Sequence, residues 1–318
     1  MVTPPPLRIV FFGTPEFAVP SLQALLGSRH PVLAVVSQPD RPKGRGQRLQ
    51  ATPTKAAALA AGVPVLQPAR IREDGFLGSL REMQADLGVV AAYGKILPDE
   101  LLALPRLGLI NVHASLLPRY RGAAPIHRAV IDGEPVTGVT IMRIVRELDA
   151  GPMMARAEHP IGHDDTSVDV ERALAALGAP LLLTVIEQLA AGTAVEVPQD
   201  DAAATFAPKI AREEGAVDWR LPAAAIHNRV RGLQPWPLVS ARLEGVRYLL
   251  HRTALTGARE NAPAGTIVAC AGDELSVAAG DGAVLRILQI QPEGRRVLSA
   301  REFLAGRHIS PGARFTSP

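Results

Sequence analysis

The chain has 318 residues, of which 47% are hydrophobic, so it is long enough for two domains and can bury a substantial core. Its single cysteine, Cys270, excludes an intramolecular disulfide and a cysteine-built zinc site, which fits a reducing compartment. Residues 1–6 carry no charged segment followed by an apolar core, and the longest apolar runs have the length of strands. We therefore predict neither a signal peptide nor a membrane span, and expect a soluble, cytoplasmic protein.

Charge is distributed unevenly along the chain. The net charge is only +3, but residues 1–205 carry 19 Lys and Arg against 21 Asp and Glu, whereas residues 206–318 carry 15 against 10. The last third therefore has a net charge of +5. A basic region of this kind suits an acidic partner, and a nucleic acid is the first to consider.

The first 191 residues alternate short apolar runs with helical segments. Apolar runs of strand length are found at residues 7–12, 31–37, 64–67, 86–92, 107–112 and 137–143. Helices are predicted to begin at Thr14-Pro15 and Thr52-Pro53, where threonine can cap and proline suits the first turn, and to cover residues 73–83, 125–131 and 167–191. This alternation predicts an α/β domain with a doubly wound, Rossmann-like parallel sheet.

The pattern changes after residue 191. Residues 192–208 combine prolines, acidic residues and small residues without periodicity, which is typical of a linker. A short helix is predicted at residues 226–232, and short strands separated by glycines and turn residues are predicted at 239–243, 247–254, 265–271, 274–279 and 283–291. We therefore predict a first domain at 1–191, a linker at 192–208 and a small, basic, barrel-like β domain at 209–318.

Two common kinds of cofactor site are not predicted. Gly13-Thr-Pro-Glu16 follows the first strand but lacks the three-glycine spacing that seats a pyrophosphate on a helix N-terminus. Gly13 is therefore assigned to a tight turn, and NAD binding is not expected. The spacing of His113, His127, His159 and His163 fits no zinc motif, so no metal is expected.

Asn111 and His113 stand two residues apart at the end of the 107–112 run, so both side chains point to one face of the predicted strand. An amide can donate hydrogen bonds to developing negative charge, and an imidazole can move protons near neutral pH, which together suit acyl transfer. Ligands of open α/β sheets bind beyond the carboxyl ends of strands, where this pair falls. Asp149 could stabilise the charged imidazole. Residue types alone leave a purely structural role open for all three.

Longer phrases around these residues resemble the folate-dependent formyltransferases over essentially the whole chain. Two departures are Ala114, where relatives commonly have glycine, and Val145-Arg-Glu147, which replaces a small or apolar approach to Leu148-Asp149. The phrases that carry the resemblance are Phe12-Gly-Thr-Pro-Glu-Phe17, Gln38-Pro-Asp-Arg-Pro-Lys-Gly-Arg-Gly46, Ala92-Tyr-Gly94, Gly108-Leu-Ile-Asn-Val-His-Ala-Ser-Leu-Leu-Pro118, Arg119-Tyr-Arg-Gly-Ala-Ala-Pro-Ile126, Leu148-Asp-Ala-Gly151 and Gln234-Pro-Trp-Pro237.

The resemblance implies a Rossmann-like catalytic domain at residues 1–191 followed by an OB-like barrel. It implies transfer of a formyl group from 10-formyltetrahydrofolate to the α-amine of methionine esterified to initiator tRNA, for translation initiation, with no metal and no covalent enzyme intermediate. Asn111, His113 and Asp149 match the family's catalytic residues one for one. The residues implied in folate binding follow two strands and are Tyr93, Gly94, Ser115, Leu116, Leu117 and Pro118.

The basic loop at residues 37–54 resembles the family's tRNA-contacting loop, which implies tRNA contacts by Arg41, Lys43, Arg45 and Arg48. The resemblance also implies a monomer. Three other functions stay open. A formyltransferase for a small amine, such as glycinamide ribonucleotide or an amino sugar, would not need the basic loop and β domain. A hydrolase could release the formyl group to water with similar residues, and a non-catalytic RNA-binding protein could keep the fold without needing all three catalytic residues.

Overall fold

The computed structural model describes residues 4–43 and 48–317. The chain divides into two compact units, each built from three segments. The N-terminal unit consists of Met1–Pro125, Val136–Pro160 and Glu171–Ala207, and the C-terminal unit consists of Ile126–Pro135, Ile161–Val170 and Pro208–Pro318. The predicted boundaries at residues 191 and 208 stay a prediction, and the second unit also contains two segments that precede residue 171.

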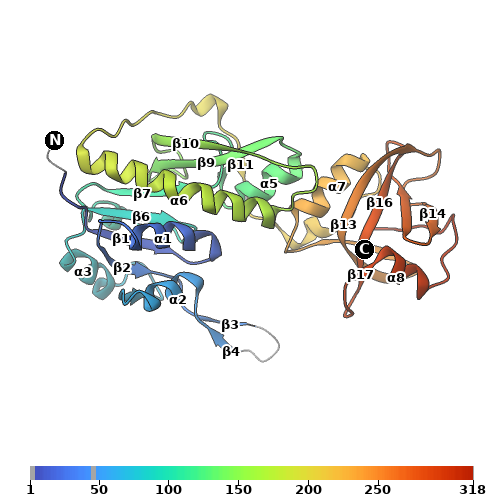
Figure 1. The fold of residues 1–318 in the computed structure, drawn as a ribbon, viewed down its shortest axis with the longest axis horizontal. Coiled ribbons are helices and arrows are strands. Elements are labelled where there is room, and N and C mark those ends of the chain that lie inside the picture. The colour runs from blue at the N-terminus through green and yellow to red at the C-terminus, as the bar shows by residue number, and fades with distance from the viewer. Residues whose placement is uncertain (1–3, 44–47, 318) are drawn as a thin grey trace. The chain divides into compact units, whose positions relative to one another are not determined.

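A seven-stranded sheet forms the centre of the N-terminal unit, in the order β10-β9-β7-β6-β1-β2-β5 (Figure 1). The strands β7, β6, β1, β2 and β5 run parallel to one another, as predicted. The strands are β1 Ile9–Gly13, β2 Val32–Val36, β5 Val65–Leu66, β6 Leu87–Ala91, β7 Leu109–His113, β9 Val136–Arg143 and β10 Met153–Pro160.

One end of this sheet differs from the prediction. The strand predicted at 137–143 is present as β9, but it runs antiparallel to β7, and β10 runs antiparallel to β9. For β9 to run parallel to β7, the connection between them would have to cross over and pack on the same sheet. The only helix between β7 and β9 in the described chain, α5 (Pro125–Asp132), belongs almost entirely to the C-terminal unit, so no such crossover forms. The sheet is therefore mixed, with a parallel majority, and β10 was not predicted.

Helices cover the sheet and close its core. They are α1 Val19–Leu26, α2 Pro53–Ala60, α3 Asp74–Glu82, α4 Asp99–Leu102 and the N-terminal unit's part of α6 Ser167–Ala191. A Cβ built on Gly178 of α6 would lie 3.0 Å from Val112 and 3.4 Å from Val139, so α6 packs closely on β7 and β9. Among the described residues, α6 is the one helix long and apolar enough to cross a bilayer by length and composition, a test that core helices also pass.

The first turn of the chain was predicted incorrectly. A 3-10 helix, η1 (Glu16–Ala18), follows β1, and α1 begins only at Val19. Thr14 caps neither helix, because its hydroxyl donates to the Tyr93 carbonyl at 3.4 Å and accepts from the Gln38 amide at 3.3 Å. Thr52, in contrast, caps α2 as predicted and accepts from the Lys55 amide at 3.3 Å.

The basic loop contains a short hairpin of β3 (Arg41–Lys43) and β4 (Arg48–Gln50), which extends away from the sheet (Figure 1). Its base is held by three polar side chains. Lys55 Nζ donates to Asp40 at 2.6 Å and to Gln67 at 2.8 Å, and Gln67 donates to Asp40 at 2.7 Å. The neighbouring cation and amide lower the pKa of Asp40. The hairpin therefore starts from a fixed base.

The C-terminal unit is built on an antiparallel sheet in the order β12-β13-β16-β15-β14, with β17 paired to β16. Residues 313–316 bridge to Arg242 of β12 and to Thr266, which precedes β14. These bridges join the two edge strands of the sheet, so the sheet closes into a barrel. The elements are η3 Arg212–Gly215, α7 Ala223–Gly232, β12 Val239–Leu243, β13 Val246–Arg259, β14 Ile267–Ala271, β15 Glu274–Ala278, β16 Ala283–Pro292, β17 Leu298–Ser299 and α8 Ala300–Ala305.

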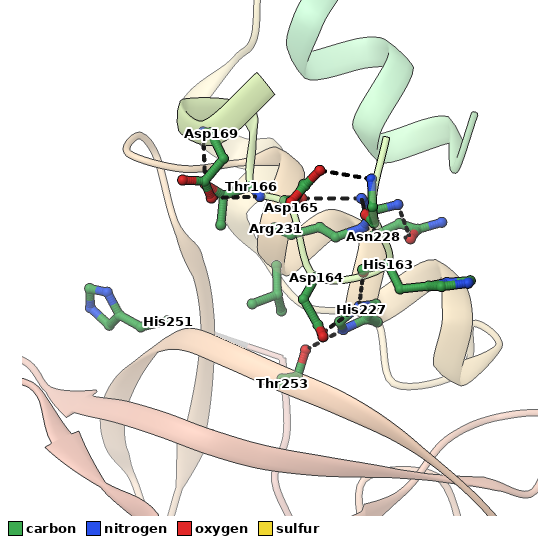
Figure 2. Close-up of polar contacts among 12 residues, drawn as sticks. His163, Asp164, Asp165, Thr166, Asp169, His227, Asn228, Arg231, His251 and Thr253 are labelled. Carbon is green, nitrogen blue, oxygen red and sulfur yellow. Dashed lines mark hydrogen bonds and ion pairs between the residues drawn. The ribbon is translucent and has the colours of Figure 1, made fainter. Parts of the chain in front are cut away.

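Polar contacts fasten residues 161–166 to α7 within the C-terminal unit (Figure 2). The buried ring of His227 lies 2.9 Å from the Thr253 hydroxyl and 2.9 Å from the His163 carbonyl. The buried Arg231 guanidinium donates to the carbonyls of Gly162 and Asp165 at 3.2 and 3.1 Å. The three carbonyl partners precede residue 208, so a chain cut at that point would deprive the buried side chains of His227 and Arg231 of these acceptors.

Candidate active site

Strand β7 brings Asn111 and His113 to the carboxyl end of the parallel part of the sheet. Asn111 pairs with Val90 on one side and Met142 on the other, and His113 pairs with Thr140. The Asn111 side chain is half-buried, and the His113 side chain is 5% exposed. The two residues alternate with Val112 and therefore share one face of the strand, as the sequence predicted.

The imidazole of His113 lies between two oxygen atoms. Its Nε2 is 3.0 Å from the carbonyl oxygen of Tyr120, and its Nδ1 is 3.6 Å from Oδ2 of Asp149. A carbonyl can only accept, so Nε2 carries a proton and donates. Nδ1 then faces a carboxylate, and a ring protonated at both nitrogens is the form that is attracted to both oxygens.

The carboxylate of Asp149 is also held by a backbone amide. Its Oδ2 accepts a hydrogen bond of 2.9 Å from the backbone amide of Gly122. Gly122 belongs to β8 (Arg121–Gly122), which pairs with β11 (Phe206–Ala207). A Cβ on Gly122 would lie 2.8 Å from the Ala207 carbonyl oxygen, and its φ of 123° lies in the region that favours glycine. The close approach of β8 and β11 therefore requires this glycine.

The loop after His113 is fixed by Thr140, a residue that the sequence analysis did not select. The buried Thr140 hydroxyl donates to the Ser115 carbonyl at 2.7 Å and accepts from the Leu117 amide at 3.1 Å. Ser115 is fully buried, and its own hydroxyl donates to the Arg119 carbonyl at 2.6 Å. Leu117 is also fully buried and precedes a cis peptide bond to Pro118. Thr140 lies inside the apolar run at residues 137–143, but nothing local marked its partners.

Tyr93 contributes its ring to the core of the N-terminal unit. The ring packs edge to face on Phe12 with centroids 5.7 Å apart, and burial raises the pKa of its hydroxyl to about 12. Its backbone carbonyl accepts from Gln38 Nε2 at 2.8 Å. The next residue, Gly94, is exposed and has a φ of 76°, and a Cβ there would lie 2.8 Å from Gln38 Nε2. A ligand can therefore contact the exposed backbone of Gly94.

Three of the four basic residues predicted to contact tRNA, Arg41, Lys43 and Arg48, lie in the strands of the hairpin. Arg41 is exposed, and its guanidinium donates to Gln38 Oε1 at 3.2 Å. For Lys43 and Arg48 the structure describes the backbone, which pairs between β3 and β4. Arg45 lies outside the described residues.

Arg121 and Gln199 are functional candidates that the sequence analysis did not assign to the site. Arg121 pairs internally. Its side chain is 7% exposed and donates to Asp201 at 2.7 Å and to Gln199 at 3.0 Å. Gln199 and Asp201 fall in the segment predicted as a linker, and this segment belongs to the N-terminal unit. These contacts could not be predicted from the sequence, because Arg121 is separated from Gln199 and Asp201 by 78 and 80 positions.

No group of three or more His, Cys, Asp or Glu in the described part of the chain could hold a metal ion. The polar groups at the site are an amide, an imidazole and a carboxylate at the end of a strand. They can donate hydrogen bonds to a developing oxyanion and move a proton near neutral pH.

Comparison with known proteins identifies the family. Residues 7–186 match the formyl transferase family, and residues 209–308 match the formyl transferase C-terminal domain. The chain belongs to the formyl transferase family. It is 45% identical to methionyl-tRNA formyltransferase from Moorella thermoacetica over 96% of this chain and 98% of that protein, and 46% identical to methionyl-tRNA formyltransferase from Methylococcus capsulatus over 97% and 99%.

Solved structures of other proteins share the fold. An N-formyltransferase from Helicobacter canadensis, in complex with folinic acid and dTDP-3-aminofucose, superposes with a TM-score of 0.68 at 17% identity, covering 90% of this chain and 99% of that one. HypX from Aquifex aeolicus in complex with tetrahydrofolic acid superposes with a TM-score of 0.63 at 17% identity, covering 94% of this chain and 47% of that one. These likenesses extend over both units of the chain.

Proposed function

We propose that this formyltransferase transfers the formyl group of 10-formyltetrahydrofolate to the α-amino group of methionyl initiator tRNA, for translation initiation. The observation that carries the proposal is 45 to 46% identity to methionyl-tRNA formyltransferases over nearly the full length of both chains. The arrangement of Asn111, His113 and Asp149 supports it, because these groups suit acyl transfer to an amine.

The reaction requires two bond changes at the formyl carbon. The α-amine attacks and forms a carbon–nitrogen bond, and the bond from the carbon to N10 of the folate then breaks. The intermediate is tetrahedral and carries negative charge on oxygen. Asn111 is the proposed hydrogen-bond donor to this oxygen, worth about 3 to 4 kcal/mol, and His113, whose two ring nitrogens face Tyr120 and Asp149, would stabilise the oxygen by its positive charge. The proton released by the amine replaces the formyl group on N10, and His113 with Asp149 relays it.

The proposed folate site lies at the ends of β6 and β7. It comprises Tyr93, Gly94, Ser115, Leu116, Leu117 and Pro118. Two structural neighbours were solved in complex with folate derivatives, folinic acid in one and tetrahydrofolic acid in the other. In this chain, Gly94 would contribute exposed backbone and Leu116 an apolar wall. Tyr93, Ser115 and Leu117 are buried and would shape the site rather than line it.

The proposed tRNA contacts are made by the hairpin and by the basic region at residues 206–318. Arg41 is the first candidate because it is exposed at the start of the hairpin. Lys43, Arg45 and Arg48 are proposed with it. The net charge of +5 over residues 206–318 would add contacts to the phosphate backbone that do not depend on sequence and weaken with salt. We expect the enzyme to act as a cytoplasmic monomer.

A second function is favoured by one observation. The fold is shared with an enzyme crystallised with a dTDP-amino sugar, so a small amine is the alternative acceptor. Single-turnover transfer from 10-formyltetrahydrofolate separates the two, with methionyl initiator tRNA, free methionine, glycinamide ribonucleotide and an amino sugar as acceptors. Fast formylation of the charged tRNA alone is expected. Formylation of a small amine, or release of formate without an acceptor, would overturn the proposed substrate.

A further inference from the structure

Asp149 adopts an unusual backbone conformation. Its φ is 49°, in the left-handed region, which is uncommon for a residue with a Cβ atom. Such a conformation persists where the surrounding structure holds it in place. The same residue presents its carboxylate to His113 at 3.6 Å, so whatever holds the turn also sets the direction of that carboxylate.

The side chain of Gln199 spans this turn. Its Nε2 donates to the carbonyl oxygen of Asp149 at 2.8 Å and to that of Gly151 at 2.7 Å. A primary amide has two N–H groups, and here both are used, one on each side of Ala150. Gly151 itself packs against β9 so closely that a Cβ would lie 2.0 Å from the Arg143 carbonyl oxygen. The turn is therefore fixed between β9 and the Gln199 amide.

Arg121 determines which way the Gln199 amide faces. Its Nε donates to Gln199 Oε1 at 3.0 Å, and a guanidinium can only donate, so the oxygen points to Arg121 and the nitrogen to the turn. Arg121 is itself held by Asp201 at 2.7 Å. The residue after it, Gly122, is the one whose amide binds the Asp149 carboxylate. Strand β8 thus orients both the Gln199 amide, which holds the turn, and the Asp149 carboxylate.

We propose that Gln199 is a positioning residue for the reaction, and that it acts by holding the Asp149 turn so that the carboxylate faces His113. The proposal rests on the proposed function, because it assigns Gln199 to the formyl transfer step. In the described part of the chain, the Gln199 side chain hydrogen-bonds to the backbone of the turn and to Arg121, so it is not a catalytic residue. Its loss lets the turn relax, and a shift of about 1 Å in a catalytic group can reduce turnover by about 100-fold.

Two variants test the role. Gln199→Ala removes both donors, and Gln199→Glu keeps an acceptor for Arg121 while it also loses both donors. We expect kcat for formylation of methionyl initiator tRNA to fall about 10- to 100-fold in each, with KM for both substrates within about threefold of wild type. Gln188→Ala, at an exposed glutamine of α6 in the same unit, is the matched control and should leave kcat unchanged.

The decisive measurement is a double-mutant cycle with Asp149→Asn. If Gln199 acts through the carboxylate, Gln199→Ala adds less than about a threefold loss once that carboxylate has been replaced. The same loss in both backgrounds would show a general structural effect and overturn the proposal. Unchanged kcat in both single variants would also overturn it, as would failure of both variants to fold, monitored by thermal unfolding.

The outcome stays separable from that of the proposed function. If the wild type does not formylate the charged tRNA, the proposed function fails. The cycle is then run with whichever amine the wild type formylates, because the geometry at Asp149 does not depend on the acceptor. If the wild type formylates tRNA but the cycle shows no coupling, only the role of Gln199 is wrong.

Discussion

Replacement of Thr140 by valine tests whether one buried hydroxyl organises the loop after His113. The side chain is fully buried, and valine has nearly the same shape, so the substitution creates no cavity. It leaves the Ser115 carbonyl and the Leu117 amide without their partner. Each unpaired buried polar group costs about 1 to 3 kcal/mol. With partial relaxation of the loop, we expect Thr140→Val to lower the free energy of unfolding by about 2 to 4 kcal/mol.

The same substitution should weaken folate binding, because the loop that Thr140 holds forms part of the proposed folate site. Urea unfolding gives the stability, and titration with a tetrahydrofolate analogue gives the affinity. Thr137→Val is the matched control, since Thr137 is also buried on β9 but has no hydrogen bond to the loop among the described residues. We expect its effect to stay below about 1 kcal/mol. Equal stability and affinity in Thr140→Val and wild type would refute the reasoning.

Three further predictions concern charged groups. Asp149→Asn should lower kcat by at least about 100-fold with the fold retained, measured by single-turnover formyl transfer beside circular dichroism. Arg41→Ala should raise KM for tRNA without changing KM for folate, and should reduce the salt dependence of tRNA binding by about one phosphate contact; Arg72→Ala, at another exposed arginine, is the control. Arg29 and His30 lower the pKa of the Glu187 carboxyl to about 2. Glu187→Gln should therefore lower the free energy of unfolding above about pH 4.5, and this difference from wild type should disappear as pH falls towards 2.

Each of these has an outcome that contradicts it. Near-normal turnover in Asp149→Asn would remove the carboxylate from the proposed mechanism. An equal loss of folate and tRNA affinity in Arg41→Ala would show that the hairpin acts on the folate site instead. Acid denaturation of Glu187→Gln and wild type could instead give a difference in unfolding free energy that stays constant from pH 6 to 2. The ion pair between Glu187 and Arg29 would then not be its cause.

The sequence by itself determined the elements whose signal is local. Buried strands such as β1 and β6 appear as uninterrupted apolar runs, because both faces of each strand are covered and the side chains are apolar. Thr52 was assigned correctly as a cap because its bond closes within three residues. Asn111 and His113 were assigned to one face because the period of a strand is fixed at two residues.

Tertiary structure decided whatever depends on a partner far along the chain. The direction of β9 was set by the missing crossover, since α5 belongs mainly to the other unit and nothing in the 137–143 run records that. Thr14 lost its predicted cap to a carbonyl 79 positions away. Arg121 and Gln199 showed no pattern in sequence, because a buried charge is tolerated only where folding brings its acceptors to it. Residue types and local periods thus determined the sheet and the catalytic candidates, whereas long-range hydrogen bonds decided which side chains hold those candidates in place.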